Sequence, residues 1–385
     1  MAQALTFRLK AHEPRLYLVH YAEMDDETSR NVSVQGLFGE DAEDPAAPTT
    51  PASRHVSFEN ACEFLRRCRM APERMRLLCS RKARDDERLA VSVEVADGGP
   101  VVEVHELSMA EGWTGCRFSP CALWLALALA QRRNAASLID ILTPIAAGRR
   151  PRALELGCGV ALAGLTAHKL GFDTVLTDCL EGHLRCLRDR LARIPREDVP
   201  ELRVRCLDWL QDAGVPISLG EHDRGSPENA CAYVGDSLGD DEHRSFDLAI
   251  ASDVLYEEHH AELLPLMLDR WLRPGGMWVL AFAIRDADMM IRFLRNLRQL
   301  NLLAREPLLQ QSEGSIRLAS AAADDDVFVH WETACWPKRC AFCSSALERD
   351  PHTYGQLVPA SFLEDLVRGH EGGAFLLHGR RPLLK

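Results

Sequence analysis

The sequence lacks the features of membrane and secreted proteins. Its longest apolar run, 121–130, is far shorter than the roughly 18 residues that a membrane-spanning helix needs. The first ten residues hold no basic stretch followed by an apolar one, as a secretion signal would. No internal repeat is visible. We therefore expect no membrane association.

Positive charge is also in deficit. The chain has 45 Lys and Arg against 57 Asp and Glu, which gives a net charge of −12 at pH 7. Non-specific nucleic-acid binding depends on clustered Lys and Arg that neutralise phosphates, so we expect no nucleic-acid partner. An acidic enzyme suits a basic or neutral partner instead.

The cysteines show no disulfide framework, because they are 13 in number and irregularly spaced. Several, such as Cys121, Cys186 and Cys206, lie within apolar runs. This pattern indicates reduced thiols in an intracellular protein, cytoplasmic with the nucleus as an alternative. Apolar residues at 46% and charged residues at 26% are typical of a globular chain.

The N-terminal region, 1–88, is predicted to be partly disordered and helical. An acidic stretch rich in Pro, Ala and Thr at 40–53 reads as a flexible linker. Apolar residues from Phe58 to Leu78 follow helical spacing, and Pro72 divides two predicted helices. Alternating residues at 89–95 and 101–107 then flank a glycine-rich turn, which predicts a β-hairpin.

Beyond residue 120 a buried helix is followed by short apolar strands that alternate with amphipathic helices. This alternation predicts βαβ units and a parallel sheet. The expected strands are 153–156, 174–177, 202–207, 246–251, 277–282, 302–309 and 374–379. The predicted fold is a doubly wound α/β domain over 89–385, with an antiparallel edge strand and with insertions at 211–245 and 310–373.

The most informative segment, 154–159, is a strand that runs into a glycine turn, Gly157-Cys158-Gly159, and then a helix. Such turns let a ligand approach backbone amides closely. The dinucleotide fingerprint needs a third glycine where Leu162 stands, which weakens a nicotinamide interpretation. A plain strand–helix connection stays an alternative.

Three further strand ends carry acidic or aromatic residues. Asp178 follows the glycine turn by about 20 residues, where a carboxylate accepts hydrogen bonds from ribose hydroxyls. Asp208 and Trp209 offer an acid and a ring for adenine, and the segment 251–256 ends the fourth strand with Asp253 and Tyr256. The structural alternatives are that Asp178 and Asp253 cap the helices that follow them and that Trp209 and Tyr256 pack in the core.

Together these motifs, over about 101–300, resemble the seven-strand protein-lysine methyltransferases that modify translation elongation factors, chaperones and calmodulin. The match is strongest with enzymes acting on eukaryotic elongation factor 2, through Glu111-Gly112, Thr114-Gly115, Phe246-Asp247 and the segment 281–286. The chain departs from the family at Val160-Ala161, where Thr-Gly is frequent, and at Ser119, which aligns with a tryptophan.

The resemblance implies an S-adenosylmethionine-dependent transfer of methyl to a lysine amine on a protein. It assigns Asp253 and Tyr256 to the orientation of cofactor and amine. The implied cofactor-binding residues are Glu155, Gly157, Cys158, Gly159, Asp178, Asp208, Trp209 and Ser252. Elongation factor 2 is the favoured partner ahead of calmodulin or a chaperone. The alternatives are a small-molecule or RNA methyltransferase and a catalytically silent adaptor that binds the cofactor.

A last cluster follows the predicted core: His330, Cys335, Cys340, Cys343 and His352. Cys340-x-x-Cys343 has metal-ligand spacing but lacks a second matching pair. We assign no metal ligands and leave open whether this cluster binds a metal.

Overall fold

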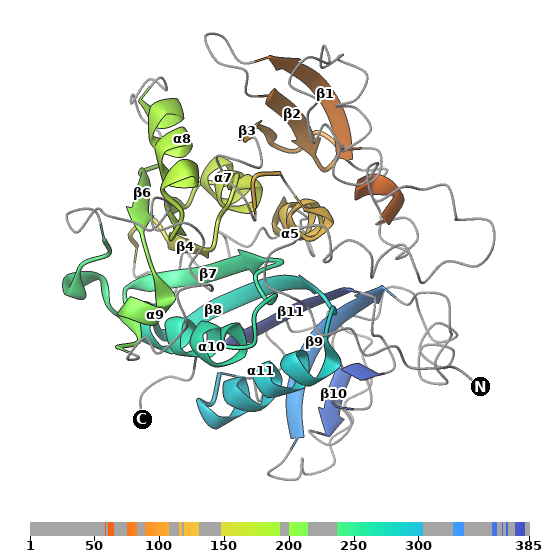
Figure 1. Cartoon of the computed structure of the whole chain (residues 1–385), viewed down its shortest axis with the longest axis vertical. Coiled ribbons are helices and arrows are strands. Elements are labelled where there is room, and N and C mark those ends of the chain that lie inside the picture. The colour runs from red at the N-terminus through yellow and green to blue at the C-terminus, as the bar shows by residue number, and fades with distance from the viewer. Residues whose placement is uncertain are drawn as a thin grey trace, which may run out of the picture.

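The computed structural model describes residues 58, 61–64, 75–82, 89–107, 115–117, 119–130, 148–192, 200–214, 237–302, 326–334, 356–359, 364, 367–368 and 374–381. Their main feature is one large sheet in the order β10-β9-β11-β8-β7-β4-β5-β6 (Figure 1). Strands β4 to β8 pair in parallel, whereas β11 runs antiparallel to both of its neighbours, β8 and β9. The predicted doubly wound sheet with an antiparallel edge strand is confirmed.

The strands of this sheet lie close to their expected positions. They are β4 (Arg152–Leu156), β5 (Asp173–Asp178), β6 (Leu202–Cys206), β7 (Phe246–Ser252), β8 (Leu272–Ala283), β9 (Asp326–Ala334), β10 (Gln356–Pro359) and β11 (Ala374–Arg380). The helices are α5 (Pro120–Ala130), α7 (Leu162–Lys169), α8 (Glu181–Leu191), α9 (Trp209–Asp212), α10 (His260–Trp271) and α11 (Ala287–Gln299), with a 3-10 turn, η3 (Asp240–Glu242).

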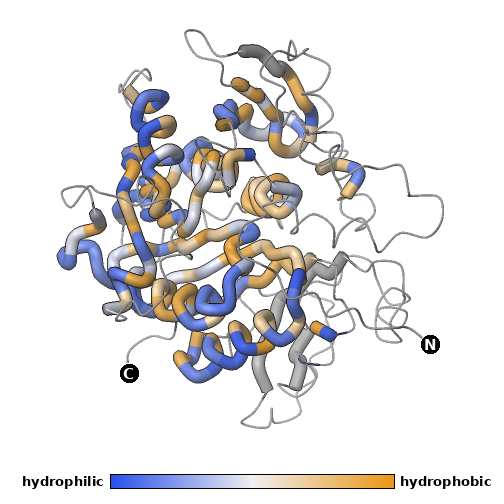
Figure 2. Tube along the Cα trace, viewed as in Figure 1, coloured by the Kyte–Doolittle hydropathy of each residue, from blue (hydrophilic) through white to orange (hydrophobic). Residues whose placement is uncertain are grey.

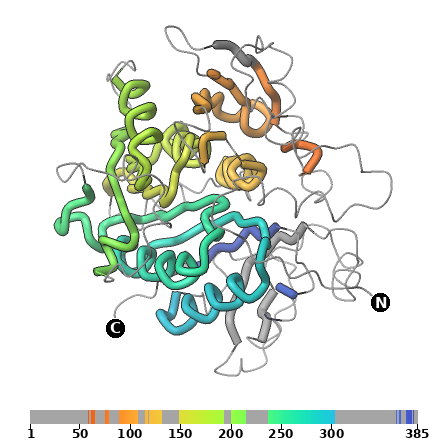
Figure 3. Tube along the Cα trace, in the orientation of Figure 1, coloured from red at the N-terminus to blue at the C-terminus, as the bar shows by residue number. Residues whose placement is uncertain are grey.

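The central strands are buried on both faces, which explains their nearly continuous apolar sequences. Along β7, Leu248 and Ile250 pack on the side of α5 and α7, while Ala249 and Ala251 pack on the side of α10 and α11. The path of the chain from one face to the other can be followed in Figure 3. These two cores fix the sheet between two layers of helices.

Helix α5 is apolar on all sides, unlike the amphipathic α11 (Figure 2). It packs against α7 and β8 on one side and against β2 of a second, three-stranded sheet on the other. That sheet has the order β1-β2-β3, with strands β1 (Met75–Lys82), β2 (Leu89–Val95) and β3 (Val101–Glu106). The predicted hairpin is confirmed as β2 and β3.

The helical prediction is wrong for β1. Residues 58 and 61–64 are helical, but Met75–Lys82 pairs antiparallel with β2, and the Arg76 guanidinium contacts the Glu94 carboxylate across the pair. Apolar residues at 75 and 78 fit helical spacing, yet Met75 is buried and Leu78 is 51% exposed. The pairing with β2 outweighs the local pattern, because it buries Met75 and places Arg76 against Glu94.

The sixth strand also differs from expectation. Its place beside β11 is taken by β9, Asp326–Ala334, rather than by 302–309, of which 303–309 lies outside the described residues. Leu302 instead ends the turn after α11, where its carbonyl accepts a hydrogen bond of 2.9 Å from Trp278 Nε1. Since β9 and β10 belong to the sheet, 310–373 is not only an insertion. The other domain boundaries stay predictions.

Two smaller expectations have different outcomes. No helix among the described segments is long and apolar enough to cross a membrane. Cys206, at the end of β6, is disulfide-bonded, so the expectation of reduced thiols is wrong at that position. Cys62, Cys116, Cys121, Cys158, Cys179 and Cys186 are free thiols. Of the cysteine-rich cluster, only His330 is described, within β9, and the remainder lies outside the described residues.

Candidate functional site

The predicted site residues follow the carboxyl ends of four adjacent strands, β7, β4, β5 and β6. The chain proceeds from β4 outward to β5 and β6 and then returns to the other side of β4 as β7. The strand order therefore reverses between β4 and β7. In doubly wound sheets, ligands bind in the crevice at this switch point.

The glycine turn after β4 requires its glycines for two reasons. Gly157 and Gly159 have φ of 64° and 50°, which side chains disfavour. A Cβ at Gly157 would come within 2.8 Å of Val254 Cγ1, and one at Gly159 within 2.8 Å of the Gly115 carbonyl oxygen. The turn is thus pressed between β7 and the segment at Gly115. Ala161 also has a left-handed φ of 62°.

Glu155 and Cys158 take up positions inside the protein. The Glu155 side chain is buried, and its Oε2 accepts a hydrogen bond of 3.0 Å from the Gly164 amide in α7. Burial raises the pKa of this carboxyl to about 8. Cys158 is buried as well, and its amide donates to the Thr177 carbonyl at 2.8 Å. Both residues hold the turn against its neighbours, and their contact with a cofactor stays a prediction.

Asp178 ends β5 directly beside the glycine turn. Its Oδ2 accepts from the Gly159 amide at 2.9 Å and its Oδ1 from the Leu180 amide at 3.0 Å. His183 Nδ1 lies 3.3 Å from Oδ2. Burial alone would raise the pKa of Asp178, but the His183 charge and these hydrogen bonds hold it below its usual value. The residue is therefore an anion that organises the turn.

Asp208 and Trp209 have separate roles after β6. Asp208 caps α9, since its Oδ1 accepts from the Leu210 and Gln211 amides at 3.0 and 3.3 Å. Trp209 instead reaches the glycine turn, where its Cζ2 lies 3.7 Å from the position of a Cβ on Gly157. Its ring also packs edge-on against His260 at 5.4 Å between centroids.

The end of β7 carries an unusual backbone. Asp253, which follows Ser252, has a φ of 58°, and its amide donates to the Ala281 carbonyl of β8 at 2.7 Å. Its Oδ2 accepts from Arg285 Nη2 at 2.8 Å, whereas Oδ1 is buried with no hydrogen-bond partner among the described residues. Ala96, Ala161, Arg244 and Asn301 also have positive φ, so Asp253 is a functional candidate because it combines this backbone with a place at the switch point.

Tyr256 lies three residues further on and is half-buried. Burial and the nearby negative charges of Asp178 and Glu257 raise the pKa of this phenol well above its usual value. Its ring packs edge-on against His260 with centroids 4.6 Å apart. The hydroxyl thus stays protonated at neutral pH.

Sequence reasoning missed several residues of this region. Arg285 was noted only as part of the segment after β8, yet it pairs with Asp253. His183, in the first turn of α8, and His260, at the start of α10, were not singled out. Their signal was a histidine a few residues after an acidic strand end, which gains meaning only once the strand order is known.

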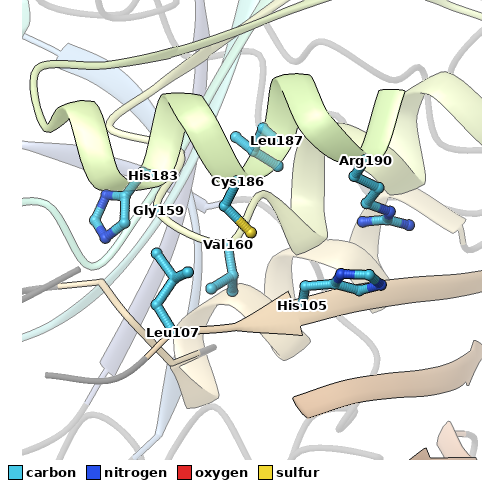
Figure 4. A pocket seen from close by; sticks show the side chains of 8 residues that line it. All are labelled: His105, Leu107, Gly159, Val160, His183, Cys186, Leu187 and Arg190. Atoms are coloured by element: carbon cyan, nitrogen blue, oxygen red, sulfur yellow. The ribbon is translucent and has the colours of Figure 1, made fainter. Parts of the chain in front are cut away.

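A narrow cleft borders the turn on the side of the three-stranded sheet (Figure 4). Side chains of α8 face the end of β3 across it, with the glycine turn as its floor. Its lining consists of His105, Leu107, Gly159, Val160, His183, Cys186, Leu187 and Arg190. The end of β3 therefore lies beside the glycine turn.

No family model matches the sequence, and no curated protein is similar to it in sequence. Similar solved structures include geranyl diphosphate methyltransferase in complex with SAM, 12% identical over 63% of this chain and 82% of that one, with a TM-score of 0.33. A SAM-dependent methyltransferase from Methanosarcina mazei is 14% identical over 61% and 94% of the two chains, with a TM-score of 0.30. The glycopeptide N-methyltransferase MtfA complexed with S-adenosyl-L-homocysteine is 16% identical over 66% and 91%, with a TM-score of 0.29. Sequence identities and TM-scores this low give no information about the function of this chain.

Proposed function

We propose that the chain is an S-adenosylmethionine-dependent methyltransferase that acts on a lysine amine of a protein, with elongation factor 2 as the favoured substrate. The observation that carries the proposal is the strained Asp253 at the switch point, with one buried carboxylate oxygen unpartnered among the described residues. The sequence resemblance and the position of Tyr256 support the lysine amine as acceptor.

The residues present fit the cofactor. The turn at Gly157 keeps side chains away from the crevice, and Trp209 supplies an aromatic surface beside it. Asp178 Oδ2 faces both the Gly159 amide and His183, whereas Oδ1 accepts only the Leu180 amide and retains a lone pair for a ribose hydroxyl. S-adenosylmethionine, when bound, would supply an electrophilic methyl group on a sulfonium.

The protein residues then have to present a neutral amine. A free lysine amine has a pKa of about 10.4, so the site must favour loss of its proton. Tyr256 cannot serve as the base at neutral pH, because its own pKa is raised. We assign it to orienting the amine through its hydroxyl, and Asp253 Oδ1 to accepting an amine N–H, with the proton released to water. In-line positioning of this kind lowers the barrier by several kcal/mol, on the order of 7–11 at most.

The net charge of −12 supports elongation factor 2 ahead of strongly acidic calmodulin, since like charges slow encounter. The test incubates the purified chain and labelled cofactor with elongation factor 2, calmodulin or a chaperone separately, and adds a Lys→Arg series on the labelled protein. We expect label in elongation factor 2, lost in Tyr256→Phe and Asp253→Asn although both still bind cofactor.

Each other outcome has a defined meaning. Label in calmodulin or a chaperone alone overturns the choice of substrate. Label in RNA or in small molecules of a cell lysate, but in no protein, overturns the lysine assignment. Cofactor binding without any transfer favours the silent adaptor.

A further inference from the structure

Three side chains beyond the candidate site converge where the loop after β7 enters α10. Glu257, His259 and His260 each offer one metal-ligand atom, and these atoms lie within 4.8 Å of one another. Among the described residues this is the one group of three or more His, Cys, Asp or Glu with such geometry. Sequence analysis did not single it out.

The ligand types point to a transition metal. One carboxylate and two imidazoles match the donor set of open zinc sites, whereas Mg²⁺ and Ca²⁺ prefer oxygen ligands alone. With bonds of about 2.0–2.1 Å, two ligand atoms of a tetrahedral zinc lie about 3.3–3.4 Å apart. His259 Nε2 and Glu257 Oε2 are 3.4 Å apart, so this pair already has the spacing of two ligand atoms around a tetrahedral zinc ion.

His260 provides a second, independent observation. The residue is 9% exposed, and its buried Nδ1 has no hydrogen-bond partner among the described residues. A buried polar atom without a partner is costly, and a metal ion would satisfy it.

We propose that Glu257, His259 and His260 bind one divalent transition-metal ion, with zinc preferred, and leave a fourth position for water or substrate. The ion would fix the His260 ring, which contacts the rings of Tyr256 and Trp209. The metal site therefore adjoins the candidate methyl-transfer site but involves none of the residues assigned above to binding the cofactor or orienting the amine. It does not depend on the proposed function.

The test measures metal binding by the full chain without cofactor or substrate. After treatment with a chelator, the protein is titrated with Zn²⁺ in competition with a chromophoric chelator, and separately with Co²⁺. We expect one site that weakens in Glu257→Gln and His259→Gln by more than the about 10–100-fold typical of losing an outer-shell partner. Glu258→Gln is the matched control, because Glu258 is adjacent, 86% exposed and outside the cluster.

The spectrum of bound Co²⁺ distinguishes this site from metal binding by the thiols of the chain. Nitrogen and oxygen ligands give Co²⁺ visible d–d bands without the near-ultraviolet charge transfer of thiolates. We expect such bands in the wild type and in Glu258→Gln and their loss in the other two variants. His259 is 26% exposed, so its variant should fold, and circular dichroism checks this. Equal zinc affinity in all four proteins, or cobalt spectra dominated by thiolate bands, overturns the proposal.

Discussion

Asp178→Asn tests whether this carboxylate organises the glycine turn. Both oxygens of Asp178 accept backbone amides, from Gly159 and Leu180. Either orientation of an asparagine amide would direct its NH2 group at one of these donors. A buried donor left unpaired costs about 1–3 kcal/mol, and the lost charge-assisted hydrogen bond adds about 1.5–3 kcal/mol.

The expected loss of stability is thus on the order of 2.5–6 kcal/mol, which corresponds to a fall in Tm of roughly 5–24 °C for a domain of this size. The affinity for S-adenosylmethionine, measured by calorimetry below the Tm, should fall at least about tenfold, because the ribose acceptor is weakened as well.

The matched control is Asp208→Asn. Asp208 engages backbone amides through Oδ1 alone, and asparagine caps helices as well as aspartate does. Its Tm should stay within about 1–2 °C of the wild type, since capping is preserved. Equal Tm values for the two variants would refute the role of Asp178 in the turn, and an unchanged cofactor affinity in Asp178→Asn would refute the ribose assignment.

Three further predictions concern stability. Asp247 is fully buried and accepts hydrogen bonds from Arg149 and Arg273, so Asp247→Asn should lose about 3–5 kcal/mol in a denaturant titration; a loss below about 1 kcal/mol would contradict this. A Cβ on Gly164 would lie 2.2 Å from Glu155 Oε2, so Gly164→Ala should lower the free energy of unfolding by about 1–3 kcal/mol in a denaturant titration. An unchanged midpoint would contradict this, because it would mean that Glu155 moves aside without loss of stability. The pKa of Glu155 is raised from 4.5 to about 8, so the folded chain keeps a proton that the unfolded chain loses, and stability should fall as pH rises through this window. Measured against Glu155→Gln at each pH, a flat difference would contradict it.

The sheet could be predicted because its signals are local. Each central strand is a short apolar run followed by an amphipathic helix, and the right-handed connection of such units leaves few arrangements. The glycine turn and Asp178 could be placed at one edge for the same reason. The residues that follow consecutive parallel strands lie at the same edge of the sheet, and this placement does not depend on which side chains they carry.

Other features depended on pairing between distant segments. The local sequence of β1 fits a helix, and only its pairing with β2, which includes the contact of Arg76 with Glu94, makes it a strand. Strand β9 is specified by its partner β11, which lies more than forty residues further along the chain. The metal-ligand cluster was missed because Glu257 and His259 resemble ordinary helix-start residues, and only the buried environment of His260 distinguishes them.

The apolar surface of α5 limits how this protein can be divided. The helix fills the space between the central sheet and the three-stranded sheet, and Leu123, Trp124 and Leu125 are almost completely buried. A fragment that begins at α5 would leave one side of this apolar helix uncovered. A fragment that begins after α5 would expose the surfaces of α7 and β8 against which the helix packs. The three-stranded sheet is therefore no detachable module. An exchange of the three-stranded sheet between related proteins would have to transfer α5 together with the strands.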